Sequence, residues 1–249
     1  MAKSSTPQGA SVSSRRFYDA YASGYDAYLR GHDGYLLAVE KAIAEASRGR
    51  PDIALLDVGT GTGERLQRLV AELRPDRVVA IDESPGMVAL AQRNCPAADV
   101  RALALGDPGL PSAIPGAFDL VTCLSNVLGH VPRDLLVPGL RQIRGLLKPG
   151  GAFVFDVNNR YSAVSYGVVS VARNVLRDCV LPRGRDFTAS YRADDEVLRT
   201  RVHLFRASEV AVLLREAGFA SARIGFRDYV TGEERGRFGG SIVVKAVNV

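Results

Sequence analysis

The chain has 249 residues, a length at which one α/β domain buries a full hydrophobic core. Hydrophobic residues make up 47% of it and charged residues 24%, which excludes fibrous and largely disordered proteins. The net charge of +5 favours anionic partners only weakly. The three cysteines are scattered and form no CxxC pair, so we expect no disulfide framework, no metal site and a reducing, cytoplasmic location.

Residues 1–14 are small and polar, without the apolar segment of a signal peptide, and are expected to form a disordered tail. No apolar run approaches the roughly 18 residues that cross a bilayer, so no membrane partner is expected. Tyrosines then recur from Tyr18 at three- and four-residue steps, which is a helical pattern. With a second helix ending near Ser47, they predict a helical segment over residues 15–50, either packed on the edge of the domain or forming a lid.

Short apolar strands alternate with amphipathic helices over residues 51–157. The predicted strands cover residues 53–58, 78–81, 100–105, 118–124 and 152–157. Because these strands are continuously apolar, they indicate a parallel sheet that is covered by helices on both faces.

The pattern becomes less regular after residue 157. Residues 158–206 are expected to cap the substrate, with a helix or lid over 161–178 and a hairpin with arms at 186–191 and 197–205. Residues 207–249 supply a helix and two closing strands. The predicted fold is therefore α/β: a doubly wound, mostly parallel seven-stranded sheet with helices on both faces, an N-terminal helical lid and a small β-hairpin insertion.

A glycine-rich turn, Asp57-Val58-Gly59-Thr60-Gly61-Thr62-Gly63, follows the first strand and opens a helix. Glycines let a ligand approach the backbone closely, and the helix N-terminus presents free amides to an anionic group. A dinucleotide site requires G-x-G-x-x-G, but Glu64 stands at the third glycine position and its carboxylate would repel a pyrophosphate. The turn therefore argues against an NAD-dependent oxidoreductase.

The turn resembles the first motif of class I S-adenosylmethionine-dependent methyltransferases of the small-molecule type. Further landmarks of that family follow in order: Asp82 after the second strand, Ser84-Pro85-Gly86-Met87, Gly106-Asp107, and segments 117–121 and 146–151. The resemblance covers the cofactor half of the chain well. It implies one methyltransferase domain over residues 15–249, with a cofactor-binding core at 51–157.

The resemblance also implies how S-adenosyl-L-methionine is held. Asp82 would bind the ribose hydroxyls, Met87 would pack against adenine, and Asp107 would reach the adenine amino group. The N-terminal tyrosines are similar to the segment that closes over the cofactor in such enzymes. The other predicted cofactor contacts are Tyr18, Tyr25, Asp57, Gly59, Gly61, Gly63, Glu83, Gly106 and Leu124.

Candidates for the chemistry lie at strand ends and on the hairpin, which face the crevice where such sheets bind ligands. His130, His203 and Tyr18 are the catalytic candidates, because an oxygen nucleophile can require a base. The predicted substrate contacts are Asn126, Asn158, Arg160 and Arg201. The arginines of this region are better explained as a solvated surface than as a site for an anionic acceptor. The anionic acceptor is the alternative and stays open.

The predicted reaction is in-line methyl transfer to an N, O or C nucleophile of a small-molecule metabolite, leaving S-adenosyl-L-homocysteine (SAH). RNA or protein methylation is one alternative, supported only by the basic pI and not by a basic-aromatic strand, so nucleic acid is disfavoured. The other alternative is a regulatory protein that binds the cofactor without catalysing a reaction. The acceptor atom, a general base and a homodimer stay open at this stage.

Overall fold

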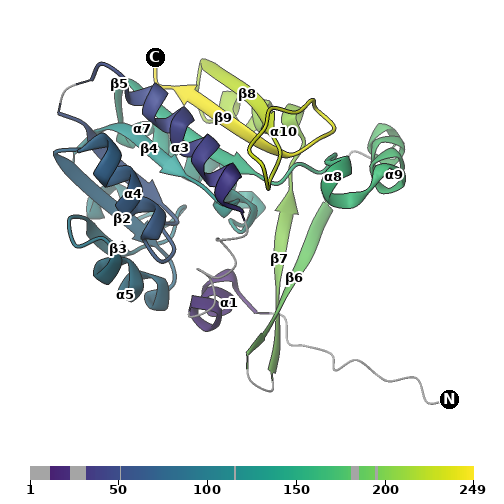
Figure 1. Cartoon of the computed structure of the whole chain (residues 1–249), viewed down its shortest axis with the longest axis horizontal. Helices are drawn as coiled ribbons and strands as arrows, with labels where there is room; N and C mark the ends of the chain where they lie inside the picture. The colour runs from purple at the N-terminus through teal and green to yellow at the C-terminus, as the bar shows by residue number, and fades with distance from the viewer. Residues whose placement is uncertain (1–11, 23–31, 51, 115, 181–184, 194–195) are drawn as a thin grey trace.

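The computed structural model describes residues 12–22, 32–50, 52–114, 116–180, 185–193 and 196–249, which form a central sheet with helices on both faces (Figure 1). The helical elements are α1 (Ser14–Tyr21), α3 (Asp33–Ser47), α4 (Glu64–Leu73), α5 (Pro85–Asn94), α6 (Leu110–Ala113), the 3-10 helix η3 (Val127–Gly129), α7 (Arg133–Leu146), α8 (Ala163–Tyr166), α9 (Val168–Val180) and α10 (Ala207–Glu216). The strands are β1 (Ala54–Val58), β2 (Arg77–Asp82), β3 (Asp99–Ala102), β4 (Phe118–Cys123), β5 (Leu147–Val157), β6 (Arg185–Ala193), β7 (Glu196–Leu204), β8 (Ser221–Arg227) and β9 (Ser241–Val247).

The main sheet has seven strands in the order β3-β2-β1-β4-β5-β9-β8, which confirms the predicted fold class. β1 to β5 run parallel, and β9 is antiparallel to both of its neighbours. The chain proceeds outward from β1 to β3 and then crosses to β4 on the other side of β1. In doubly wound sheets, ligands bind at the carboxyl ends of the strands beside such a switch point.

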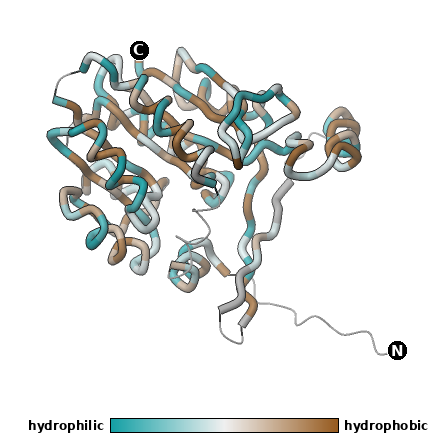
Figure 2. The backbone as a smooth tube through the Cα atoms, in the orientation of Figure 1, coloured by the Kyte–Doolittle hydropathy of each residue, from teal (hydrophilic) through white to brown (hydrophobic). Residues whose placement is uncertain are grey.

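Successive side chains of each strand face opposite sides of the sheet and pack against different helices. Leu55 belongs to the cluster that contains Ile43 of α3 and Leu66 of α4, whereas the neighbouring Leu56 belongs to the cluster that contains Leu140 of α7. All five side chains are at most 1% exposed. Figure 2 shows the hydrophobic residues concentrated along these strands. The sheet is therefore buried on both faces, as its continuously apolar strands predict.

Three elements differ in extent from their predictions. β3 ends at Ala102 rather than near residue 105, because the chain turns where the Asp107 amide donates to the Ala104 carbonyl. β5 already begins at Leu147 and includes the predicted helix stop at 148–151. The predicted helix or lid over 161–178 consists of α8 and α9.

The tyrosine-rich N-terminal segment is described only in part. Ser13 caps α1, its hydroxyl accepting from the Arg16 amide, and α1 ends at Tyr21. The predicted cofactor contact Tyr25 lies outside the described residues. Among the helices of the described ranges, none has both the length and the apolar character needed to cross a bilayer.

The predicted hairpin is confirmed. β6 and β7 form a separate antiparallel sheet that extends away from the core (Figure 1). Leu198, Thr200 and Val202 of β7 are buried, while Arg201 on the opposite side is exposed. α1 packs against this hairpin and against α5, so it bridges the hairpin and the main sheet.

Phe153 of β5 provides a test of this core. Its side chain is 0% exposed, and its ring centroid lies 4.6 Å from that of Phe155 and 6.0 Å from that of Phe219. Phe153→Ala is expected to lower the free energy of unfolding by about 3–5 kcal/mol, measured by urea denaturation. Leu37→Ala on α3, where the side chain is 62% exposed, should change it by less than about 0.5 kcal/mol. Equal losses in both variants would contradict the assigned core.

Candidate active site

The glycine turn between β1 and α4 has a backbone conformation that favours glycine. Gly59, Gly61 and Gly63 have φ angles of 70°, 59° and 81°, a region that residues with a Cβ rarely occupy. A Cβ on Gly59 would lie 2.3 Å from the Val127 side chain, and one on Gly63 would lie 2.8 Å from the Ala91 Cα. Gly59 and Gly61 line the cavity described next, whereas Gly63 packs against α5.

A cavity of about 220 Å³ lies at the carboxyl ends of β1, β2 and β4. Its polar side chains are Tyr18, Asp82, Glu83, Ser125 and His130. Its apolar lining comprises Val58, Ile81, Met87, Leu103, Ala104, Leu105, Val127, Val131, Pro132 and Leu135. Ligand sites commonly combine such an apolar wall with a few convergent polar groups.

Asp82 ends β2, and two backbone amides hold its carboxylate at the cavity. Oδ2 accepts from the Gly61 amide and Oδ1 accepts from the Ser84 amide, each at 2.9 Å. Burial raises the pKa of Asp82 to about 6, although these two hydrogen bonds act in the opposite direction. Each carboxylate oxygen keeps a second lone pair. Asp82 can therefore also accept hydrogen bonds from a pair of ribose hydroxyls, so it fits the predicted cofactor.

Tyr18 and His130 are 112 positions apart in sequence and meet at the cavity. The Tyr18 hydroxyl lies 2.9 Å from His130 Nε2, and the two rings pack edge to face with centroids 5.1 Å apart. Burial lowers the pKa of His130 to about 4, so the imidazole is neutral at pH 7. Within the described ranges, its buried Nδ1 has no hydrogen-bond partner. One ring nitrogen is thus positioned by Tyr18 and the other is uncommitted.

α1, which belongs to the segment predicted as a lid, contributes Tyr18 to the cavity lining. Beside Tyr18, Asp19 Oδ1 accepts from the Ser84 hydroxyl at 2.5 Å and from the Gly86 amide at 2.9 Å. Asp19 therefore joins α1 to the start of α5, and Tyr18 joins it to the segment after η3. Both of these segments contribute residues to the cavity lining.

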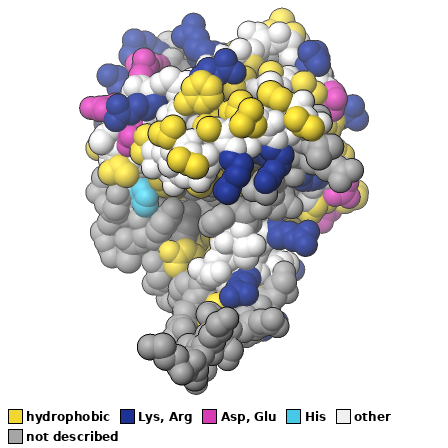
Figure 3. Space-filling model, turned by 90° about the vertical axis from the view of Figure 1, so that its right-hand side faces the viewer, with side chains coloured by type: hydrophobic (Ala, Val, Ile, Leu, Met, Phe, Trp, Pro, Cys, Tyr) yellow, Lys and Arg dark blue, Asp and Glu magenta, His cyan; other side chains and the backbone are white. Residues whose placement is uncertain are grey.

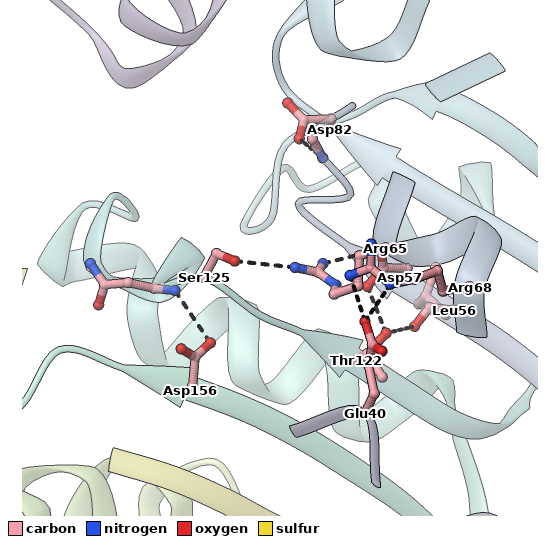
Figure 4. Close-up of polar contacts among 11 residues, drawn as sticks. Glu40, Leu56, Asp57, Arg65, Arg68, Asp82, Thr122, Ser125 and Asp156 are labelled. Atoms are coloured by element: carbon pink, nitrogen blue, oxygen red, sulfur yellow. Dashed lines mark hydrogen bonds and ion pairs between the residues drawn. The ribbon is translucent and has the colours of Figure 1, made fainter. Parts of the chain in front are cut away.

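Asp57 directly precedes the glycine turn and is outside the cavity lining. Figure 4 shows its contacts with Thr122 and Arg65. Its side chain is 0% exposed; Oδ1 accepts from the Thr122 hydroxyl at 2.6 Å, and Oδ2 pairs with the Arg65 guanidinium at 3.5 Å. Arg65 also donates to the Ser125 hydroxyl at 3.2 Å. Asp57 therefore supports the cavity wall at Ser125 through Arg65.

The loop after β4 contains two consecutive residues in the left-handed region, Ser125 at φ 66° and Asn126 at φ 60°. Such backbone strain concentrates at functional sites. The Asn126 amide donates to Asp156 Oδ1 at 3.3 Å, and the Tyr35 hydroxyl donates to Asp156 Oδ2 at 2.6 Å. Burial raises the pKa of both Asp156 and Tyr35. Asn126 Oδ1 accepts from the Asn158 amide at 2.8 Å, so this strained loop is tied to the end of β5.

His203, the second predicted catalytic histidine, lies outside the cavity lining. It is 3% exposed, and both ring nitrogens have neighbours: Nε2 is 2.8 Å from Glu209 Oε1 and Nδ1 is 2.9 Å from Arg133 Nη2. The predicted substrate contact Arg160 is 1% exposed and pairs with Asp178 at 2.6 Å. Arg201 is exposed on β7.

The structure thus brings one group of predicted residues together at the cavity: Tyr18, Gly59, Gly61, Asp82, Glu83, Met87 and His130. A second group lies outside the lining: Asp57, Gly63, Gly106, Asp107, Leu124, Asn126, Asn158, Arg160, Arg201 and His203. Of these, Asp107 is exposed, and its carboxylate accepts from the Gly109 amide at 2.7 Å. The roles assigned to both groups stay predictions.

Sequence reasoning missed Arg65 and most of the apolar wall. Leu103 and Leu105 had been placed in a strand, and Leu135 fits the core periodicity of a helix, so neither pattern separates a cavity residue from a core residue. For Arg65, the available signal was an arginine on the face of α4 that also carries buried Leu66 and Leu69.

The chain is similar to known methyltransferases. A family model described as a methyltransferase domain matches residues 55–151. The chain is 31% identical over 188 residues to the ubiquinone biosynthesis O-methyltransferase of Xanthomonas campestris pv. campestris, covering 72% of this chain and 74% of that protein. It is 32% identical over 186 residues to the acetylserotonin O-methyltransferase of Mus musculus, covering 70% and 46%.

Solved structures share the fold at low sequence identity. Magnesium protoporphyrin IX methyltransferase from Synechocystis PCC 6803 with bound SAM has a TM-score of 0.59 and 18% identity, covering 94% of this chain and 96% of that one. The DhpI–SAM–HEP complex has a TM-score of 0.66 and 23% identity, covering 93% and 94%. This likeness is evidence of a common fold.

Asp82→Asn tests the ribose assignment. A hydrogen bond to a charged acceptor contributes about 1.5–3 kcal/mol, so the substitution is expected to weaken SAH binding by about 10- to 100-fold in calorimetry. Because the pKa of Asp82 is about 6, SAH affinity of the unchanged chain should fall as the pH is lowered through that value. The variant should show little pH dependence in this range. An unchanged affinity would remove the assignment.

Proposed function

Because the chain belongs to the class I S-adenosylmethionine-dependent methyltransferases, we propose that it methylates a hydroxyl oxygen of a small-molecule acceptor. The observation that carries this proposal is the Tyr18–His130 pair, in which a neutral imidazole at the cavity has one uncommitted nitrogen. A hydroxyl acceptor must lose its proton, whereas an amine needs only to be unprotonated. The relatives named as O-methyltransferases support the same acceptor atom.

In this proposal, the cavity binds the ribose and the adenine of S-adenosylmethionine. Asp82 would bind the ribose hydroxyls through its free lone pairs, and Met87, Leu103 and Leu135 would enclose the adenine. When bound, the cofactor supplies a methyl group that its sulfonium has already activated. The chain's own task is to position the acceptor, exclude water and take up one proton.

His130 is proposed as the base. With Nε2–H donated to the Tyr18 hydroxyl, the lone pair on Nδ1 accepts the hydroxyl proton of the acceptor. Methyl transfer removes one positive charge from the cavity, and protonation of His130 adds one, so the total charge stays the same. The buried imidazole has a low pKa because burial disfavours its charged form. Since the total charge of the cavity does not rise during the reaction, this penalty on protonating His130 is offset. The same low pKa favours release of the proton to solvent after the product leaves.

Residues at the ends of β4 and β5 are proposed to position the acceptor. Asn126 is 6% exposed, and within the described ranges its Nδ2 donor has no hydrogen-bond partner. A buried donor without a partner is costly, so a bound oxygen atom would relieve that cost. Asn158 stands next to it because its amide donates to Asn126 Oδ1. α1 would exclude water from the cavity through the contacts of Asp19 with Ser84 and of Tyr18 with His130.

The substrate class is tested with the isotope-labelled methyl group of S-adenosylmethionine. Incubation with a cell extract, followed by separation into nucleic acid, protein and metabolites, is expected to place the label in metabolites. Mass spectrometry should then locate it on an oxygen atom. Label in RNA or protein would contradict the small-molecule proposal, and no incorporation would indicate a protein that binds the cofactor without turnover.

His130→Ala tests the base. With the acceptor found by labelling, kcat should fall by about 10²- to 10⁴-fold, because general-base catalysis contributes that much. SAH affinity should change little, since Asp82 is retained. His32→Gln is the control: that ring lies 4.5 Å from Tyr229 and outside the cavity lining, and kcat should stay within about twofold.

The pH profile gives a second measure of the same base. Since burial holds the pKa of His130 near 4, the neutral imidazole persists far below the ordinary range of a histidine. At saturating cofactor, kcat should stay level down to about pH 5 and recover after a return to neutral pH. A decline centred near pH 6.5 would mean that a solvated histidine, and not buried His130, is the base.

A further inference from the structure

A large apolar surface lies on the outside of α8 and α9. Five of its side chains are between 65% and 82% exposed: Val164, Val168, Val169, Leu176 and Val180. Figure 3 views the molecule from the side on which α8 and α9 lie in Figure 1, and it shows a band of hydrophobic side chains with Lys and Arg side chains beside it. Contiguous exposed apolar patches of this kind mark interaction sites. We refer to these five residues as the α9 apolar face.

α9 is an amphipathic helix whose apolar side faces solvent. Its buried residues are Val171, Asn174 and Asp178, of which two are polar. Asp178 accepts from the Arg160 guanidinium at 2.6 Å and from the Tyr161 hydroxyl at 2.7 Å. A surface helix ordinarily buries its apolar stripe. Polar bonds therefore hold α9 in the opposite orientation, and its apolar face is available to a partner.

The charges beside this face indicate the chemistry of that partner. Arg173 and Arg177 are exposed and one turn apart, so they follow one edge of the helix. Asp178 is the only acid in α8 and α9, both of which are described in full, and it is buried against Arg160. A symmetric dimer through α9 would bring the arginines of both copies together with no acid from these helices between them.

An anionic bilayer would bind both the α9 apolar face and the arginines beside it. Valine and leucine side chains enter the boundary between head groups and acyl chains, while arginines at the edge bind lipid phosphates. α9 is about 20 Å long at 1.5 Å per residue and would lie in the plane of the interface. Binding of this kind needs no membrane-spanning helix.

We propose that α8 and α9 form an interfacial anchor that binds this protein peripherally to bilayers containing anionic phospholipid. The inference goes beyond the expectation from sequence that the chain has no membrane partner. It is independent of the proposed acceptor, because none of the five residues of the α9 apolar face lines the cavity.

The absence of tryptophan from the sequence allows a direct reporter. Val169→Trp introduces one fluorophore into the α9 apolar face, and Leu37→Trp introduces one at an exposed position of α3. With vesicles of phosphatidylcholine and phosphatidylglycerol, emission from position 169 should shift to the blue and be quenched severalfold by brominated acyl chains. Emission from position 37 should not change. Equal responses at both positions would overturn the proposal.

Sedimentation of the unchanged chain together with vesicles measures its affinity for the bilayer. We expect binding to the anionic vesicles, weaker binding to phosphatidylcholine alone, and a decrease as salt is added. The triple variant V169S/L176S/V180S should bind at least about 10-fold more weakly, since each substitution removes a buried apolar group. R173Q/R177Q should lose on the order of 10-fold, specifically with anionic vesicles. SAH affinity of each variant shows that it is folded and keeps this experiment separate from the proposed reaction.

Two outcomes would overturn the proposal. One is absence of sedimentation with anionic vesicles, or sedimentation that the serine variant leaves unchanged. The other is a concentration-dependent dimer without lipid, seen by analytical ultracentrifugation and removed by the same serine substitutions, which would assign the α9 apolar face to a second copy of the chain.

Discussion

The carboxylate of Asp57 has no contact with solvent, and both β4 and α4 bond to it through Thr122 and Arg65. Removing one partner of a buried ion pair leaves an uncompensated charge and costs about 3–5 kcal/mol. The strand, its neighbour and the helix after the glycine turn are therefore held in one arrangement. Because Arg65 also donates to Ser125, the same contact determines where the wall of the cavity stands.

This arrangement divides the cavity into two halves with different chemistry. Ile81 and Asp82 line the cavity from β2, where the proposed function places the adenosine of the cofactor. Tyr18 and His130 meet beside the loop after β4, where a proton can be taken up. α1 contacts both halves, through Asp19 to the start of α5 and through Tyr18 to His130. The position of α1 therefore depends on contacts with both halves.

The positions of Gly59, Gly61 and Asp82 at the cavity could be predicted from sequence because their determinants are local. The glycine turn and Asp82 each follow directly from a strand end, and a strand end in a parallel sheet has a known position. The Tyr18–His130 pair could not be predicted, since it joins residues 112 positions apart. α9 shows another limit: its periodicity predicts a helix, but the choice of buried face depends on Arg160 and Tyr161 bonding to Asp178.

Exclusion of water accounts for the properties of both titratable groups at the cavity. Burial disfavours whichever form is charged, so it raises the pKa of Asp82 to about 6 and lowers that of His130 to about 4. At neutral pH the result is one carboxylate that accepts hydrogen bonds and one imidazole in its neutral form. A more open cavity would return the pKa of His130 toward the ordinary value of a histidine, so the imidazole would become cationic at a higher pH than it does when buried. The lid contacts of α1 therefore bear on acid–base chemistry as well as on binding, because they keep solvent from the imidazole that the proposed reaction needs in its neutral form.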